Sequence, residues 1–270
     1  MNRSALGGFI ALSVLLFSVA ATSGQAQEVI LIEDDFTNPA GDMPNEDEGD
    51  SPIGGDRTTL TCWWQSNRCC NNVFDGVTNL EMPFVGVWSS YIDSRQCGTE
   101  LAGGVSYAYV AVFRKTQGGD FSVGFGSGGG WGANAGEEDR VRLVNLGPDG
   151  DISVHPGGVG HSDLSPIIDT GTDIQLGVIQ SVGILIGEDG VVSVFFNSGE
   201  AKNWQFDGSA WVEITPSGIP AMPPGGNLIG ANAANDNGSS DPFILDYIAL
   251  VENPDMGPVP NEVMRWSLYD

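Results

Sequence analysis

The run of residues 243–251 constrains the fold of this chain more than any other stretch. It reads Phe-Ile-Leu-Asp-Tyr-Ile-Ala-Leu-Val, and an apolar run rich in β-branched and aromatic residues is typical of a buried strand. A Gly/Asn/Asp/Ser stretch at residues 230–241, which we expect to be a loop, precedes the run, and Pro254 follows it. Residues 28–33, Glu-Val-Ile-Leu-Ile-Glu, have the same character near the other end. We therefore predict that these two end strands pair, with hairpins between them.

Turn signals divide the intervening chain into short strands. Three of these turns contain Asp-Gly, the strongest short hairpin signal, because glycine accepts a positive φ without steric penalty. No stretch shows helical periodicity with caps, and no repeat of fixed length recurs. The sequence predicts an all-β fold, an antiparallel β-sandwich of jelly-roll type. The predicted hairpins join residues 105–114 to 121–125, 141–146 to 152–155, 174–186 to 191–196, and 204–206 to 211–214, and further strands are expected at 58–64 and 84–90.

The N-terminal residues 1–26 have the features of a secretory signal peptide. Arg3 precedes an apolar run, and Gly24-Gln25-Ala26 forms a small-residue cleavage site before Gln27. A membrane anchor is the alternative interpretation, but the run is short for a bilayer span, and no later segment predicts one. We expect a protein that is secreted or held at the cell surface, with the periplasm as a second location. The β-sandwich domain is predicted at 27–252, and a linker and tail at 253–270.

The chain is strongly acidic. It has 10 Lys and Arg residues against 35 Asp and Glu residues, and its net charge is −25. Such a surface repels phosphate backbones, so nucleic acid is excluded as a partner. A salty habitat is an alternative explanation for this composition.

Four cysteines lie close together in the sequence: Cys62, Cys69, Cys70 and Cys97. Export favours disulfide bonds. Adjacent cysteines bridge each other only with strain, so we expect Cys69 and Cys70 to bond outward, one to Cys62 and one to Cys97. Metal binding is the weaker alternative, because no histidine is near and the spacing is not a zinc pattern.

The sequences of the two end strands resemble those of a known group of proteins. A first strand running into Asp34-Asp35-Phe36, a last strand carrying Asp246, and the segment Gly-Asn-Leu-Ile-Gly-Ala-Asn at 226–232 resemble the concanavalin A-like lectin/glucanase superfamily, including its laminin-G-like members. The resemblance implies a jelly roll whose first and last strands share one sheet. Members include lectins, carbohydrate-binding modules, glycanases and polysaccharide lyases, so the fold does not choose among these functions.

No catalytic residue can be assigned, and whether the chain is an enzyme stays open. The glucanases of this superfamily carry Glu-x-Asp-x-x-Glu, which has no match here, and Glu137-Glu138-Asp139 has the wrong spacing for the two carboxylates of glycoside hydrolysis. The two histidines, His155 and His161, could supply the base of a histidine/tyrosine lyase. A glycan-active hydrolase or lyase is therefore the second hypothesis.

Tryptophans in glycine-rich or disulfide-rich surroundings are the candidate ligand-binding residues. Sugar rings stack on exposed aromatic faces, while Asn, Asp and backbone groups supply hydrogen bonds. Trp131, with Asn134, lies in Gly-Gly-Gly-Trp-Gly-Ala-Asn, and Trp63 and Trp64 precede the cysteine cluster. We expect Trp204 and Trp211 to form a cross-strand pair instead.

Carboxylates near the end strands suggest a structural calcium ion, which takes oxygen ligands. Asp34 and Asp35 could meet Asp246 if the end strands pair, and a second placement is the Asx-rich loop holding Asn235, Asp236, Asn237 and Asp241.

The preferred function is non-catalytic binding of an extracellular polysaccharide or glycoconjugate. A structural or adhesive surface protein that associates with copies of itself is the third hypothesis.

Overall fold

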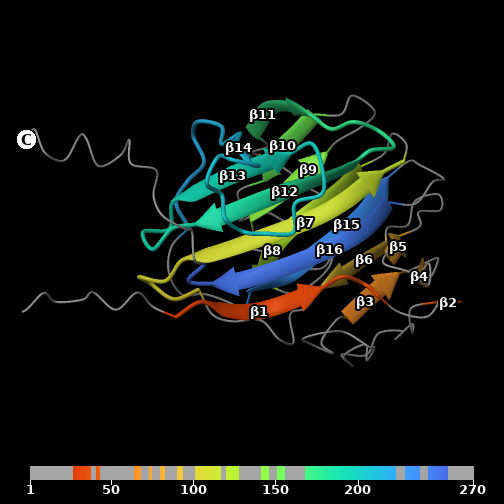
Figure 1. Ribbon diagram of the computed structural model, residues 1–270, viewed down its shortest axis with the longest axis horizontal. Helices are drawn as coiled ribbons and strands as arrows, with labels where there is room; N and C mark the ends of the chain where they lie inside the picture. The colour runs from red at the N-terminus through yellow and green to blue at the C-terminus, as the bar shows by residue number, and fades with distance from the viewer. Residues whose placement is uncertain are drawn as a thin grey trace, which may run out of the picture.

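Two antiparallel sheets packed face to face form the molecule (Figure 1). The computed structural model describes residues 27–37, 41–42, 64–67, 73–74, 80–82, 90–93, 101–116, 120–127, 141–145, 151–155, 168–222, 229–237 and 243–254. These residues contain strands and turns and no helix. The all-β jelly-roll prediction is confirmed.

The first sheet has nine strands and contains both end strands. β1 pairs antiparallel with β16, with Glu33 opposite Ala249 and Asp34 opposite Ile248, as the sequence predicted. Figure 1 shows β1 and β16 side by side with β7 and β12 beyond them. The order is β14 (Val212–Glu213), β13 (Val192–Asn197), β12 (Ile179–Ile186), β7 (Tyr107–Lys115), β16 (Phe243–Glu252), β5 (Leu80–Met82), β4 (Val73–Phe74) and β2 (Gly41–Asp42), with β1 (Val29–Asp34) on β16.

The second sheet has seven strands. Its order is β11 (Ile168–Asp173), β10 (Asp151–His155), β9 (Val141–Asn145), β8 (Asp120–Ser127), β15 (Ile229–Asn237), β6 (Ser90–Asp93) and β3 (Trp64–Asn67). The predicted hairpin between β9 and β10 is confirmed, and so is the one between β12 and β13 in the first sheet.

The core lies between the two sheets. Alternate residues of β8 and β10, such as Val123 and Val154, meet Ile184 and Leu250 of the first sheet, and all four are buried. Three phenylalanine rings join the sheets: the centroid of Phe113 lies 4.9 Å from that of Phe121 and 5.4 Å from that of Phe243. Apolar area removed from water in this interface is the main source of stability.

The predicted hairpin between residues 105–114 and 121–125 is wrong, although both strands exist. β7 pairs with β12 and β16 in the first sheet, whereas β8 pairs with β9 and β15 in the second. β7 is buried along almost its whole length, because it is a central strand covered on both faces. The Gly-Gly signal between the two strands could not indicate that they belong to different sheets.

Two other predicted strands are corrected. Residues 174–178 are not strand: Gly177 has φ +76°, its N–H donates to the Lys115 carbonyl, and β12 begins only at Ile179. The buried Gln180 side chain holds this turn through hydrogen bonds with Gln175 and with the Val178 carbonyl. Residues 204–206 form no strand either, and β14 pairs with β13 instead.

The stretch predicted as a loop at 230–241 contains β15. Its sequence, Ile-Gly-Ala-Asn-Ala-Ala-Asn-Asp-Asn, is typical of loops, yet it pairs with β8 on one side and β6 on the other. Tertiary pairing overrides weak intrinsic β-propensity at such a position. Asn235, Asp236 and Asn237 therefore lie in a strand rather than a loop, and Asp241, the fourth suggested ligand, lies outside the described residues.

Candidate functional site

A tight turn ends β1. The Asp34 carboxylate, which is 1% exposed, accepts the Phe36 N–H at 2.7 Å. Phe36 has φ +54°, an uncommon conformation for a residue with a Cβ. The Asp34 side chain stabilises this turn locally, and the turn directs the Phe36 ring into the core.

A β-bulge in β16 places two successive residues toward the outer face of the first sheet. The pairing with β7 shifts between Leu245 and Tyr247, so Asp246 is the extra residue. Leu245 packs in the core, whereas Tyr247 packs in a second cluster on the outer face. The bulge thus sets Asp246 beside Tyr247 on that outer face, where Lys202 contacts both.

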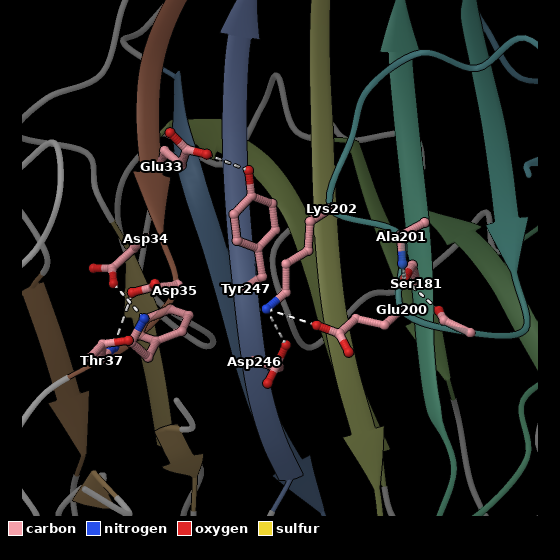
Figure 2. A network of polar contacts seen from close by, with 12 residues as sticks. Glu33, Asp34, Asp35, Thr37, Ser181, Glu200, Ala201, Lys202, Asp246 and Tyr247 are labelled. Carbon is pink, nitrogen blue, oxygen red and sulfur yellow. Dashed lines mark hydrogen bonds and ion pairs between the residues drawn. The ribbon is translucent and has the colours of Figure 1, made fainter. Parts of the chain in front are cut away.

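Lys202 is the centre of a polar network on this outer face (Figure 2). Its Nζ lies 2.9 Å from Asp246 Oδ2, 2.9 Å from Glu200 Oε1, and 5.7 Å from the centroid of the Tyr247 ring. The Tyr247 hydroxyl donates to Glu33 Oε1 of β1 at 2.9 Å. Among the described residues, Asp246 Oδ2 is buried and has no hydrogen bond of good geometry, so the lysine charge compensates it.

The electrostatics of the network raise the pKa of both Tyr247 and Lys202. Burial, the hydrogen bond to Glu33, and the negative charge of that carboxylate raise the pKa of Tyr247 far above its usual value. Burial lowers the pKa of Lys202, but its interactions with the Asp246 and Glu200 carboxylates outweigh this effect, so its pKa is raised. Tyr247 stays a protonated donor and Lys202 a cation, so neither serves as a base or nucleophile.

Residues 199–211, the crossing segment, lie over the outer face of the first sheet (Figure 1). Ser181 of β12 holds its start, since its hydroxyl donates to the Gly199 carbonyl and accepts the Ala201 N–H, both at 2.7 Å. The Phe206 ring stacks on Phe195 of β13 at 4.3 Å between centroids and meets the edge of Trp211. The chain itself therefore occupies this face, and the network serves to attach the crossing segment.

Lys202→Ala is expected to lower the free energy of unfolding by about 1–3 kcal/mol, because it leaves the buried Asp246 carboxylate without its cation. The value is reduced by the partial exposure of the Lys202 side chain, 34%. Urea unfolding measures the change. Glu200→Gln, at a side chain that is 49% exposed, is the control and should cost less than about 0.5 kcal/mol. Equal effects of the two variants would contradict the structural role of the Lys202–Asp246 pair.

The three carboxylates suggested as calcium ligands are not brought together. Asp34 is the register partner of Ile248, a core residue, whereas Asp246 faces outward to Lys202. Within the described ranges, no group of three or more His, Cys, Asp and Glu side chains could hold a metal ion. Asp35 Oδ1 accepts the Thr37 N–H at 3.2 Å. These residues do not fit a shared calcium site in this arrangement.

The outer face of the second sheet carries the other set of candidate residues. Positions along a strand alternate between two faces, and directly paired positions share a face. Val123 and Val154 belong to the core, so the positions next to them in the chain belong to the opposite face. One line of register partners crosses six strands on that face, and we call it the register row: Trp64, Asp93, Asn232, Gly124, Arg142 and His155.

A second line of register partners runs parallel to the register row, at positions two residues away from it on each strand. It places Tyr91 beside Asp93 and puts small residues, Ala234 and Ser122, at the middle of the sheet. Each line has an aromatic position on β3 or β6, Trp64 or Tyr91, whereas the two basic positions, Arg142 and His155, lie on the register row alone. The parallel line consists of Ser66, Tyr91, Ala234, Ser122, Val144, Ser153 and Asp169.

Sequence reasoning found two of the row's residues. Trp64 was selected as a sugar-stacking candidate and His155 as a candidate base. Asp93, Asn232 and Arg142 were missed, because they stand in no local motif and only strand register aligns them. Trp63, Trp131 and Asn134 lie outside the described residues, as do His161, Glu137-Glu138-Asp139 and the four cysteines.

The number of strands between two residues gives the distance between them, which can be compared with what a hydrolase or a lyase would need. Four strand intervals separate His155 from Tyr91, about 19 Å at 4.8 Å per strand, which is too far for both to act on one sugar. Asp93 is the one carboxylate of the register row. Asp151 and Asp173 are register partners, but both are exposed on the last two strands rather than enclosed in a cleft. The register row therefore aligns no two carboxylates, and no histidine with a tyrosine, on neighbouring strands.

The fold is that of the concanavalin A-like lectin/glucanase superfamily, as the resemblance predicted. Among solved structures, the chain is similar to the endo-1,3-β-glucanase from Streptomyces sioyaensis, with 13% identity, a TM-score of 0.51, and coverage of 83% of this chain and 96% of that chain. It is also similar to the Ca²⁺/Man3GlcNAc-bound exoplasmic/lumenal domain of VIP36 (12% identity, TM-score 0.47, 75% and 88% covered) and the metal-free carbohydrate recognition domain of Emp46p (10%, 0.46, 77% and 94%).

These likenesses establish the fold alone, and lectins and glucanases share it. No family model and no curated protein matches the chain. In the part of the chain that the structure describes, there is no helix long and apolar enough to cross a bilayer.

Proposed function

We propose that this chain is an extracellular, non-catalytic carbohydrate-binding protein and that the outer face of its second sheet binds the glycan. The main support for the proposal is the register row. Its positions across six strands include an aromatic residue, an acid, an amide and two basic residues. Signal-peptide features of residues 1–26 support the extracellular location.

The composition of the row suits a sugar polymer. An indole stacks on the apolar C–H face of a sugar ring, while carboxylate, amide and guanidinium groups form hydrogen bonds with its hydroxyls. Gly124, Ser122 and Ala234 are the small residues at the middle of this sheet. On the opposite sheet, the crossing segment packs over the outer side of β7, β13 and β16.

Trp64→Ala is expected to weaken binding to a recognised polysaccharide about 10-fold or more, in line with a loss of 1–3 kcal/mol per stacked ring. Affinity electrophoresis against a panel of soluble polysaccharides, followed by titration calorimetry of any hit, measures the change. Trp204→Ala removes an indole from the crossing segment on the other sheet and is the control, with thermal unfolding recorded for both variants.

Two outcomes would contradict this function. In the first, the wild-type protein binds no member of a broad panel. In the second, Trp64→Ala and Trp204→Ala bind equally well while both stay folded. Release of reducing ends or unsaturated products from any polysaccharide would replace the binding proposal with the hydrolase or lyase alternative.

Calcium is examined in the same titration. The exoplasmic/lumenal domain of VIP36 has been solved in a Ca²⁺/Man3GlcNAc-bound form, but the three predicted carboxylates of this chain do not converge. Binding that disappears in EDTA and returns with added calcium would support an ion that shapes the site. Binding that is indifferent to EDTA would remove calcium from the proposal.

A further inference from the structure

The residue that follows the predicted cleavage site stands just outside the first sheet. Gln27 is exposed and precedes β1, whose first register pair is Val29 with Glu252. Cleavage after Gly24-Gln25-Ala26 makes Gln27 the first residue of the mature chain. Only Glu28 then separates the new N-terminus from the paired strand.

Glu28 is held by the fold through its side chain. The indole N–H of Trp204 donates to Glu28 Oε2 at 2.8 Å, and Glu28 is half-buried. Trp204 belongs to the crossing segment and packs against the outer-face cluster of the first sheet. The contact therefore ties the start of β1 to a segment that lies 176 residues later in the chain.

We propose that Gln27 is converted to an N-terminal pyroglutamate once the signal peptide has been removed. The neutral α-amine attacks the side-chain carbon Cδ, and the new C–N bond closes a five-membered lactam. The Cδ–Nε2 bond breaks, and the amide nitrogen leaves as ammonia with a proton from the amine. The ordinary pKa of an α-amino group is about 7.7–8.0, so part of it is neutral and nucleophilic near neutral pH. The step consumes no oxidant and no second substrate.

The local structure leaves this reaction free to proceed. Ring closure requires the side chain of the first residue to fold back onto its own nitrogen, so the residue must not be fixed in a strand ladder or in the core. Gln27 meets this condition, because it is exposed and lies before the first register pair of β1 with β16. Val29, two residues later, is already paired with Glu252.

The lactam protects the contact between β1 and the crossing segment. Exposed termini are preferred sites of proteolysis, and aminopeptidases need a free α-amine, which pyroglutamate lacks. Without the lactam they would remove Gln27 and then Glu28, and the Trp204 N–H would lose its acceptor. The inference goes beyond the proposed function, since it depends on export of the chain and not on glycan binding.

Mass spectrometry of the N-terminal peptide tests the modification. The full chain is expressed in an exporting host and prepared at about pH 6, where the α-amine is protonated and cyclisation during handling is slow. The peptide should begin at Gln27 and be lighter by about 17 Da, the mass of ammonia. Gln27→Asn is the matched control: its amide is one methylene shorter, closure would need a strained four-membered ring, and no mass should be lost. A wild-type peptide that keeps a free amine, or that begins at another residue, overturns the proposal.

Aminopeptidase treatment tests what the lactam protects. The wild-type protein should stay intact, whereas Gln27→Asn should lose residues 27 and 28. This trimming should lower the unfolding temperature by about 2–4 °C, the shift for one net hydrogen bond in a chain of this size. Adding Trp204→Phe to Gln27→Asn removes the indole N–H, so trimming should then change the unfolding temperature much less.

The outcomes separate this proposal from the proposed function. Trimming that lowers the unfolding temperature equally with and without Trp204→Phe would contradict the protective role of the lactam. Glycan binding is measured on the same wild-type samples. A protein that carries the lactam and binds no glycan would contradict the proposed function and leave the pyroglutamate in place.

Discussion

Replacing Phe113 with alanine is expected to lower the free energy of unfolding by about 4 kcal/mol, within the range for truncating a fully buried phenylalanine. Phe113 is 0% exposed on β7 of the first sheet. Its ring contacts Phe243 of the same sheet and Phe121 of the second sheet, and the Phe121 and Phe243 rings stack at 4.8 Å. The truncation therefore removes packing within one sheet and between both.

Urea unfolding of the whole chain, followed by tryptophan fluorescence, measures this change. Phe113→Leu keeps most of the volume and should cost clearly less, since hydrophobic exchanges of similar size are tolerated best. Val191→Ala, at a side chain that is 53% exposed, should change stability by less than about 0.5 kcal/mol. A loss below about 1.5 kcal/mol for Phe113→Ala would mean that the three rings are not a packed junction.

Gly183→Val is expected to cost about 3 kcal/mol or more, at the upper end of the range for overpacking. A Cβ at residue 183 would lie 2.3 Å from Cε1 and 2.6 Å from Cζ of Phe206. The ring cannot move aside easily, because it is stacked on Phe195 with an interplanar angle of 3° and meets Trp211 on another side. The substitution must therefore displace the crossing segment from the first sheet.

A double-mutant cycle tests this explanation. Phe206→Ala removes the ring that opposes the new side chain, so adding Gly183→Val to Phe206→Ala should cost much less than adding it to the wild-type protein. Gly104→Val is the comparison for a glycine whose Cβ would meet no atom within 4 Å, although its φ of +75° adds backbone strain. Additive losses for Gly183→Val and Phe206→Ala would rule out their contact as the cause.

Local sequence patterns predicted the end strands, the pairing of β9 with β10 and the turn at 188–190, because these depend on residues close in the chain. They did not predict which sheet a strand joins. β7 and β8 are separated by a glycine pair, yet they lie in different sheets because β7 has partners on both sides already. β15 was missed because its Gly, Ala and Asn residues have low β-propensity and only pairing with β8 and β6 makes it a strand.

The candidate site was predicted in fragments for the same reason. Trp64 is noticeable in the sequence because tryptophans beside a cysteine cluster often contact ligands or disulfides, and His155 because histidines are rare in this chain. Arg142 has no such signal, and only strand register places it opposite His155 and Gly124. The bulge at Asp246, which sets the Lys202 network, also has no sequence signature within residues 243–251.

The position of β16 has a consequence for how the protein is made. β16, the last strand of the chain, pairs with β7 on one side and with both β1 and β5 on the other. The first sheet therefore lacks a central strand until residue 252 has been synthesised. Contacts of such long sequence separation form slowly, after the loop-closure entropy between the chain ends has been overcome. A nascent chain therefore completes this sheet only after its last strand has left the ribosome. Any truncation before residue 243 should leave a polypeptide that never reaches the folded state.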